Sequence, residues 1–242
     1  MYNVAVIEVV MNFSGIEKMS LVDYDGYVSA TVFTPGCNFR CGFCHNSPLV
    51  LGTEKLPIIP EEEILSYLTK RKGILEGLCI TGGEPTLQKE LPLFCEKVKN
   101  LGYKVKVDTN GTSPEMVKTL FSNGLADYFA MDIKADKNSY AKIIGFDSFD
   151  TAKIQQTISF FLTEKVNYEF RTTLIKEFHN EEVVINIGQW IKGANKYFLQ
   201  KFKDSENCIQ SHLSPVDENI VLKFQDILKN YIPNTYLRGY GI

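Results

Sequence analysis

The sequence lacks any long apolar run, and none approaches the ~18 residues of a membrane-spanning helix. Its first residues give no sign of a secretory signal, because no basic segment is followed by a long apolar one. Neither charge is in large excess: the formal net charge is -3, which leaves no strong field to attract nucleic acid or an anionic membrane. We therefore expect a cytoplasmic protein that binds neither nucleic acid nor membrane.

Cysteine and histidine are scarce, with six and three residues among 242. The cytoplasm keeps thiols reduced, so we do not expect the cysteines to form a disulfide framework. Cys79 lies in an apolar run and Cys95 in a helical pattern, and we interpret both as core residues. Cys208, in a polar connection, is ambiguous, and we assign no role to His179 or His212. The other three cysteines form one dense group.

That group is Cys37, Cys41 and Cys44, at C-x3-C-x2-C spacing. Thiolates this close can bind one small cluster without help from distant parts of the chain. Iron–sulfur clusters are held by cysteine thiolates and normally use four. A loop that offers three leaves one iron open, and an open iron can bind and activate a ligand.

Other interpretations of this group remain open. A zinc site could use His45 as its fourth ligand, although zinc loops usually add a second cysteine pair downstream. The segment from Cys41 to His45 also matches the C-x-x-C-H pattern of c-type haem, a group attached in exported proteins. A disulfide with a spare thiol is a third alternative, and Cys79 or Cys208 could supply a fourth cluster ligand.

The cysteine group, followed by His45-Asn46 and later by Gly82-Gly83-Glu84-Pro85, resembles the radical S-adenosylmethionine superfamily. The similarity runs from about Val28 to about Gln200 and is greatest to the glycyl-radical-enzyme activases, in particular the activating proteins of anaerobic ribonucleoside-triphosphate reductase. This resemblance implies a [4Fe-4S] cluster on the three cysteines and S-adenosylmethionine as cofactors. It also implies a glycyl radical enzyme as protein substrate and a low-potential electron donor such as flavodoxin or ferredoxin.

The resemblance also implies roles for residues that follow predicted strands. The two glycines let a ligand approach the backbone, and Glu84 would accept hydrogen bonds from the methionyl ammonium group. Asp108 and Asp132 would hold a monovalent cation near the methionyl carboxylate, since hard carboxylate oxygens suit a hard cation. Lys134 would contact the cofactor directly. The alternative for these stretches is an ordinary Gly-Gly turn and two solvated strand ends.

Three further residues complete the predicted site. Phe43 would lie against the adenine, and Gln200 stands where related activators carry a histidine near the ribose. Arg171, a charged residue in a buried strand, needs a partner, which is either a structural ion pair or the cofactor or target peptide. The candidate cofactor-binding residues are Phe43, Cys44, His45, Gly82, Gly83, Glu84, Asp108, Thr109, Asp132, Lys134, Arg171 and Gln200.

Hydrophobic periodicity predicts strands that alternate with helices along most of the chain. The predicted strands cover residues 3–10, 27–34, 78–81, 103–107, 128–133, 168–175 and 196–200. The predicted helices cover residues 61–70, 88–100, a segment opened by Ser113 as cap, 151–163, 181–191 and 217–231, the last burying Ile220, Phe224, Ile227, Leu228 and Tyr231. Residues 11–26 are expected to be a loop with an extra hairpin, and 201–216 a long loop.

This alternation indicates a parallel sheet with right-handed crossovers. About six β/α units follow the first strand, whereas eight are needed to close a barrel. The predicted fold is α/β, a partial (β/α)6 TIM-type barrel open along one side, with an N-terminal β extension and a C-terminal helix. We expect a single domain over 1–242, with the extension at 1–26, the partial barrel at 27–200 and a C-terminal loop and helix at 201–242.

Together these features predict a radical enzyme that cleaves S-adenosylmethionine reductively and generates a glycyl radical on a partner, with anaerobic ribonucleoside-triphosphate reductase as that partner. The alternatives are a pyruvate formate-lyase-type activase, a small-molecule enzyme such as 7-carboxy-7-deazaguanine synthase, or a binding module that carries zinc or a cluster without catalysis. No second set of close cysteines is present, which indicates a single cluster. We expect no side chain to act as acid or base, and we interpret residues 237–241 as the activase's own tail.

Overall fold

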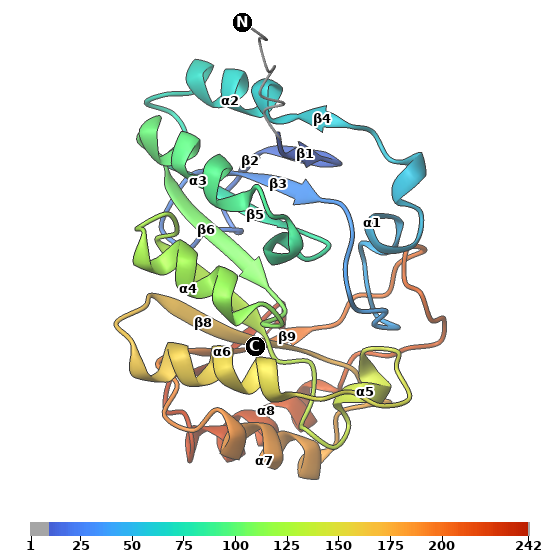
Figure 1. Cartoon of the computed structure of the whole chain (residues 1–242). Coiled ribbons are helices and arrows are strands. Elements are labelled where there is room, and N and C mark those ends of the chain that lie inside the picture. The colour runs from blue at the N-terminus through green and yellow to red at the C-terminus, as the bar shows by residue number, and fades with distance from the viewer. Residues whose placement is uncertain (1–9, 242) are drawn as a thin grey trace, which may run out of the picture.

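The computed structural model describes residues 10–241, and its centre is an eight-stranded sheet in the order β10-β9-β8-β7-β6-β5-β3-β2 (Figure 1). All neighbours in the sheet are parallel except β2, which pairs antiparallel with β3 at one edge. The strands are β2 (Gly15–Ser20), β3 (Ser29–Thr34), β5 (Gly77–Gly82), β6 (Lys104–Thr109), β7 (Tyr128–Asp132), β8 (Tyr168–Leu174), β9 (Tyr197–Lys201) and β10 (Thr235–Arg238).

Helices connect successive parallel strands and line the outside of the curved sheet (Figure 1). They are α1 (Ser47–Leu51), α2 (Glu61–Lys70), α3 (Leu91–Asn100), α4 (Pro114–Ser122), α5 (Tyr140–Ile143), α6 (Ala152–Thr163), α7 (Glu181–Trp190) and α8 (Glu218–Lys229). A small second sheet pairs β1 (Asn12–Phe13) with β4 (Ile59–Pro60). Within residues 10–241, no helix is long and apolar enough to cross a bilayer. The predicted open barrel of six β/α units is confirmed, with β10 as a further parallel strand.

Several local predictions differ from the structure. The strand expected at residues 3–10 falls almost wholly on residues 1–9, which lie outside the described residues. The Ser113 side chain makes no capping hydrogen bond at the start of α4. In α8 the buried residues are Val221, Phe224 and Leu228, whereas Ile220 is exposed, so the predicted face is right for Phe224 and Leu228 but includes Val221 in place of Ile220.

The three parts expected within the single domain do not match the limits of the sheet. The proposed extension at 1–26 contributes β2, and the proposed C-terminal segment contributes β10. One contiguous hydrophobic core runs from Met11 to Ile232. The division of the chain stays a prediction, but its first and last parts both belong to the central sheet.

The two faces of the sheet differ in polarity, as the alternation of side chains along a strand requires. One face is apolar and packs under the helices: the Phe161 ring of α6 lies 5.5 Å from that of Phe129 and 6.1 Å from that of Phe170. The opposite, concave face carries Lys106, Asp108, Asp132, Glu169 and Arg171. A parallel sheet normally buries apolar side chains on both faces, so this charged lining marks the inner face as unusual.

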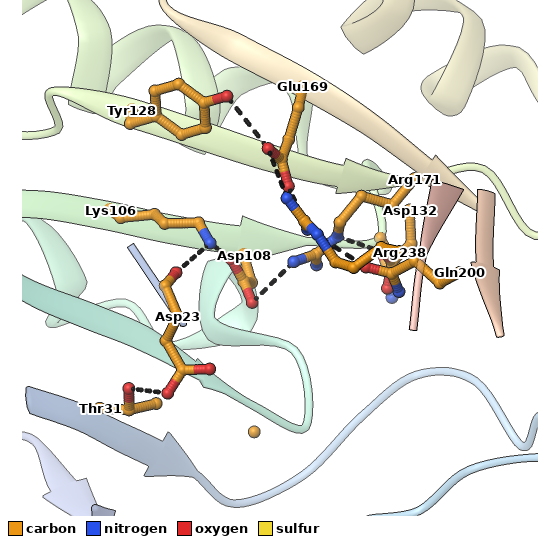
Figure 2. A network of polar contacts seen from close by, with 12 residues as sticks. Asp23, Thr31, Lys106, Asp108, Tyr128, Asp132, Glu169, Arg171, Gln200 and Arg238 are labelled. Carbon is orange, nitrogen blue, oxygen red and sulfur yellow. Dashed lines mark hydrogen bonds and ion pairs between the residues drawn. The ribbon is translucent and has the colours of Figure 1, made fainter. Parts of the chain in front are cut away.

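Ion pairs compensate the charges on the concave face, which Figure 2 shows from close by. The Arg171 guanidinium bridges two neighbouring strands, with Nη1 3.2 Å from Asp108 Oδ2 and Nε 2.9 Å from Asp132 Oδ1. The Lys106 ammonium donates to the Asp23 carbonyl and lies 3.5 Å from Asp108 Oδ1 (Figure 2). Buried charges are stable only when they are paired and hydrogen-bonded, so these contacts fix how the strands sit beside one another.

The C-terminal strand links the two edges of the sheet through Arg238. Its guanidinium lies 2.9 Å from Glu169 Oε1 and 3.4 Å from Asp25 Oδ2, in the loop between β2 and β3. The same group lies over the Phe198 ring at 3.8 Å. Of residues 237–241, interpreted from sequence as the activase's own tail, the first two therefore belong to a strand, and Arg238 ties one edge of the open barrel to the other.

Removal of Arg238 should destabilise the fold, because the Glu169 side chain is only 2% exposed and would lose its charged partner. Losing one partner of a buried pair costs ~3–5 kcal/mol, and since Arg238 itself is 31% exposed we expect Arg238→Gln to lower the free energy of unfolding by about 2–3 kcal/mol. The measurement is the urea-unfolding midpoint. The control Lys229→Gln, in an exposed pair with Asp226, should change the free energy by less than ~1 kcal/mol. Equal effects of the two substitutions would contradict this account.

Candidate functional site

The carboxyl ends of β3 and β5 to β8 meet around a cavity of about 190 Å³. The loop from Cys37 to Asn46, which follows β3, forms one wall, and the ends of the next four strands supply the rest. The three cysteines and all candidate cofactor-binding residues except Gln200 line this cavity. Sites in open α/β folds are found at the carboxyl ends of the strands. The structure gathers there residues from Cys37 to Thr173, which lie on five different strands or the loops after them.

The cysteine loop is partly buried, and burial controls its chemistry. The Cys41 side chain is buried, and burial raises its pKa to about 12 despite the nearby Lys134 ammonium. Burial raises the pKa of Cys37 and Cys44 too. Thiolates in such a place need positive charge beside them, which the irons of a cluster provide. The three cysteines are therefore more stable as thiolates bound to a metal cluster than as free thiolates.

The other three cysteines do not join the group. Cys79 in β5 and Cys95 in α3 are buried away from the cavity, as predicted. Cys208 is half-buried beside Ser205 Oγ at 3.7 Å and does not line the cavity. All six cysteines are free, so no disulfide forms. Among residues 10–241, no three His, Cys, Asp or Glu side chains are arranged to hold one metal ion. A cluster does not need its ligands to meet at one ion, because each thiolate binds a different iron.

Gly82 and Gly83 let the cysteine loop approach β5. A Cβ on Gly83 would lie 1.9 Å from the Gly36 carbonyl oxygen, and one on Gly82, at φ 115°, would lie 2.5 Å from the Thr34 nitrogen. The Gly83 N–H donates to Thr34 O at 2.8 Å, and the Glu84 N–H donates to Gly36 O at 2.8 Å. From sequence these glycines are predicted to admit a ligand, whereas in the structure the segment from Phe33 to Gly36 packs against them.

Glu84 is 1% exposed and satisfied largely by the protein. Its Oε1 accepts from the Thr86 hydroxyl, from Thr86 N at 3.1 Å and from Thr109 Oγ1 at 2.8 Å, and its Oε2 accepts from Asn110 N at 2.6 Å. Burial raises the pKa of this carboxyl. The hydrogen bonds favour the charged form and lower the pKa, but burial has the larger effect. A carboxylate oxygen has two lone pairs, so Oε2 keeps one free acceptor position beside the cavity.

The charged groups of the concave face reach the cavity at Lys134. Its Nζ lies 2.8 Å from Asp132 Oδ2 and 5.7 Å from the centre of the Phe43 ring. Burial would raise the pKa of Asp132, but Arg171 and Lys134 hold it at about 2. Burial would lower the pKa of Lys134, but Asp132 outweighs that effect and raises it. Both side chains are therefore charged at neutral pH.

The ion pairs of the two aspartates bear on the expected cation. Asp108 contacts Lys106 and Arg171, and Asp132 contacts Arg171 and Lys134, so each carboxylate already has two cationic partners. An added cation would have to displace one of these partners.

Two residues lie differently from what the sequence predicted. Gln200 stands behind the cavity wall, with Nε2 donating to the Thr173 hydroxyl at 3.4 Å and Oε1 accepting from Arg238 at 3.3 Å. His179, which received no role, supports Lys134: its Nδ1 accepts from Ile175 N at 3.0 Å, and its Nε2 therefore donates to Lys134 O at 3.0 Å. Burial lowers the pKa of His179, so the ring is neutral. The sequence carried no signal for this contact, because His179 lies 45 residues after Lys134.

Comparison with known proteins agrees with this geometry. Residues 31–184 match the profile of the Radical SAM superfamily. A Methanocaldococcus jannaschii protein that carries the name of a glycyl-radical enzyme activating enzyme is 33% identical over 93% of this chain and 95% of its own length. The pyruvate formate-lyase-activating enzyme of Clostridium pasteurianum is 31% identical over 75% of this chain and 83% of its own. A 7-carboxy-7-deazaguanine synthase from Koribacter versatilis is 28% identical over 68% of this chain and 69% of its own.

Solved structures share the fold. Streptococcus suis SuiB bound to its precursor peptide SuiA superposes with a TM-score of 0.69 at 15% identity, covering 87% of this chain and 48% of SuiB. This chain thus spans about half the length of SuiB. A domain of pyruvate-formate lyase-activating enzyme from Bacteroides vulgatus gives a TM-score of 0.54 at 18% identity, covering 68% of this chain and 99% of that domain. At these identities the likeness shows the open-barrel fold alone.

The close packing at Gly83 gives a direct test of the site. Gly83→Ala should displace the cysteine loop, because the new methyl group would overlap backbone atoms that cannot move aside; we expect the free energy of unfolding to fall by about 3 kcal/mol. We also expect most iron binding to be lost, measured as iron content after anaerobic reconstitution. The matched control is Gly52→Ala, where the nearest atom would be 3.9 Å away. If both variants bind iron like the parent protein, this packing argument is wrong.

Proposed function

The chain belongs to the radical S-adenosylmethionine superfamily, among the glycyl-radical-enzyme activating enzymes, and we propose that it activates anaerobic ribonucleoside-triphosphate reductase by generating a glycyl radical on that enzyme. Membership brings a [4Fe-4S] cluster and S-adenosylmethionine as cofactors. Pyruvate formate-lyase is the alternative protein substrate, because a pyruvate formate-lyase-activating enzyme is among the relatives. The proposed location is the cytoplasm, with flavodoxin or ferredoxin as electron donor.

The observation that carries the proposal is the position of Cys37, Cys41 and Cys44 in the wall of the charged cavity. No other cysteine lines that cavity among the described residues. A cluster held there would have three thiolate ligands and one iron facing the space where a ligand can enter. When bound, the cluster supplies the single electron that cleaves a sulfur–carbon bond of S-adenosylmethionine.

The proposed contacts follow from the charges and acceptors around the cavity. The Lys134 ammonium and the Arg171 guanidinium both line the cavity and suit the methionyl carboxylate. The free acceptor position of Glu84 Oε2 suits the ammonium group, and the Phe43 ring offers a flat apolar surface to the adenine. Gln200 would act on the ribose only through Thr173, which does line the cavity. In each contact the chain binds and orients, and no side chain transfers a proton.

An activase is favoured over a small-molecule enzyme by the extent of the match. The resemblance to the M. jannaschii protein covers both chains almost completely, whereas the 7-carboxy-7-deazaguanine synthase matches over about two thirds of each. His45-Asn46 and the Asp108–Gly111 segment also favour the activase branch.

The proposal is tested by electron paramagnetic resonance. The protein is reconstituted anaerobically with iron and sulfide, reduced, and mixed with S-adenosylmethionine and either anaerobic ribonucleoside-triphosphate reductase or pyruvate formate-lyase. We expect 5′-deoxyadenosine and a glycyl radical signal on the reductase, and neither with Cys37→Ala, Cys41→Ala or Cys44→Ala. The control Cys208→Ala should retain both. A radical on pyruvate formate-lyase alone would replace the proposed partner, and 5′-deoxyadenosine with no protein radical would favour a small-molecule substrate.

The role of Lys134 can be separated from the chemistry by measuring binding. Lys134→Met keeps the length of the side chain but removes the charge beside Asp132, so we expect the dissociation constant of S-adenosylmethionine to rise by about tenfold to a hundredfold, roughly 1.4–2.8 kcal/mol. Equilibrium dialysis against the cluster-loaded protein measures it. The control Lys137→Met lies outside the cavity over the Trp190 ring and should bind like the parent. An unchanged dissociation constant for Lys134→Met would exclude the proposed contact.

A further inference from the structure

Two N–H groups approach the sulfur of Cys37, and one of them comes from a different loop. The Phe39 N–H donates to Cys37 Sγ at 3.3 Å, as neighbouring residues in a tight loop often do. The Asn110 side chain, which follows β6, places Nδ2 4.0 Å from the same sulfur. Asn110 is 5% exposed and lies 73 residues after Cys37. A buried amide thus lies against one cluster ligand.

The hydrogen bonds around Asn110 determine which way its amide faces. Its Oδ1 accepts from Thr112 N at 3.0 Å and from Thr112 Oγ1 at 2.7 Å. Its Nδ2 donates to Asn38 Oδ1 at 2.8 Å, and Asn38 Nδ2 donates to Thr112 Oγ1 at 2.9 Å. A flipped amide would place its NH2 against the Thr112 N–H, a donor, and its oxygen against Asn38 Oδ1, an acceptor. The group that faces Cys37 is therefore the NH2, not the carbonyl.

The backbone of the same loop is held from both sides. The Asn110 N–H donates to the buried Glu84 carboxylate at 2.6 Å. The next residue, Gly111, accepts a hydrogen bond on its carbonyl from Thr157 Oγ1 at 2.8 Å. The amide is thus fixed before any ligand binds, as a group that tunes a metal site must be.

A simpler role for Asn110 explains only part of these contacts. Asparagine often accepts from the backbone N–H two residues on, in an Asx turn, and Asn110 does so at Thr112. That turn uses Oδ1 alone, and an aspartate would make it equally well. An aspartate would, however, place a charged oxygen against the Cys37 sulfur. One Nδ2 hydrogen is used by Asn38 Oδ1, and a hydrogen bond to the Cys37 thiolate uses the second, which the turn does not explain.

We propose that Asn110 is a positioning residue that raises the reduction potential of the cluster by donating an N–H···S hydrogen bond to the Cys37 thiolate. The inference rests on the proposed function, since it requires the cluster. Hydrogen bonds to the ligand sulfurs are among the factors that set the potential of iron–sulfur clusters. On one-electron reduction the sulfurs become more negative, so a donor stabilises the reduced state more than the oxidised one. Burial strengthens that effect, because the local dielectric is low.

Redox titration of the cluster-loaded protein without S-adenosylmethionine tests the proposal, with dithionite as reductant and the electron paramagnetic resonance of the reduced cluster as the signal. Asn110→Leu has a similar shape but no N–H, so we expect the midpoint potential to become more negative by about 59 mV, a tenfold change in a one-electron equilibrium. Thr112→Val leaves the amide in place but loosens its ring of hydrogen bonds, and should shift the potential in the same direction by less.

The matched control is Thr157→Val, which removes the hydrogen bond to Gly111 in the same loop without touching the sulfur. It should leave the midpoint potential unchanged even if it lowers stability. The proposal fails if Asn110→Leu keeps the parent potential, or if Thr157→Val shifts it as far. If Asn110→Leu does not hold iron, Thr112→Val decides, and an unshifted potential there overturns the proposal. A parent protein that binds no cluster would instead overturn the proposed function.

Discussion

The buried carboxylate of Glu84 is the constraint from which the arrangement of the site follows. A carboxylate that is 1% exposed must find donors within the protein. It takes them from Thr86 just after β5 and from Thr109 and Asn110 at the end of β6. The Glu84 N–H in turn donates to Gly36, at the start of the cysteine loop. One residue therefore joins the ends of three strands and sets the distance between the cysteines and the rest of the cavity.

The charged concave face gives this framework its chemical character. The Lys134 ammonium and the Arg171 guanidinium line the cavity beside Asp108 and Asp132, and Arg171 connects the two aspartates. Such a network fixes its members in place, because each would be left as an unpaired buried charge if it moved. A ligand with a carboxylate finds positive charge already oriented, and so loses less free energy in ordering the site.

Much of this was predictable from sequence, because the governing signals are local. Apolar periodicity located the six β/α units, and cysteine spacing located the loop that lines the cavity. The misses involve contacts between distant residues. Strand β10 was missed because four residues carry too little periodic signal, and His179 because its partner is a backbone carbonyl 45 residues away. The glycines after β5 were recognised, but the backbone that packs on them became visible only in the structure.

The central claim is that three cysteines hold a cluster whose remaining iron faces the cavity and takes a ligand there. The most direct measurement is electron–nuclear double resonance of the reduced cluster with S-adenosylmethionine isotopically labelled at its amino nitrogen and its carboxylate oxygens. The account predicts hyperfine coupling to both labels, which shows that the two groups bind the open iron. A fully loaded cluster that couples to neither label, with the same spectrum whether or not S-adenosylmethionine is present, would contradict it.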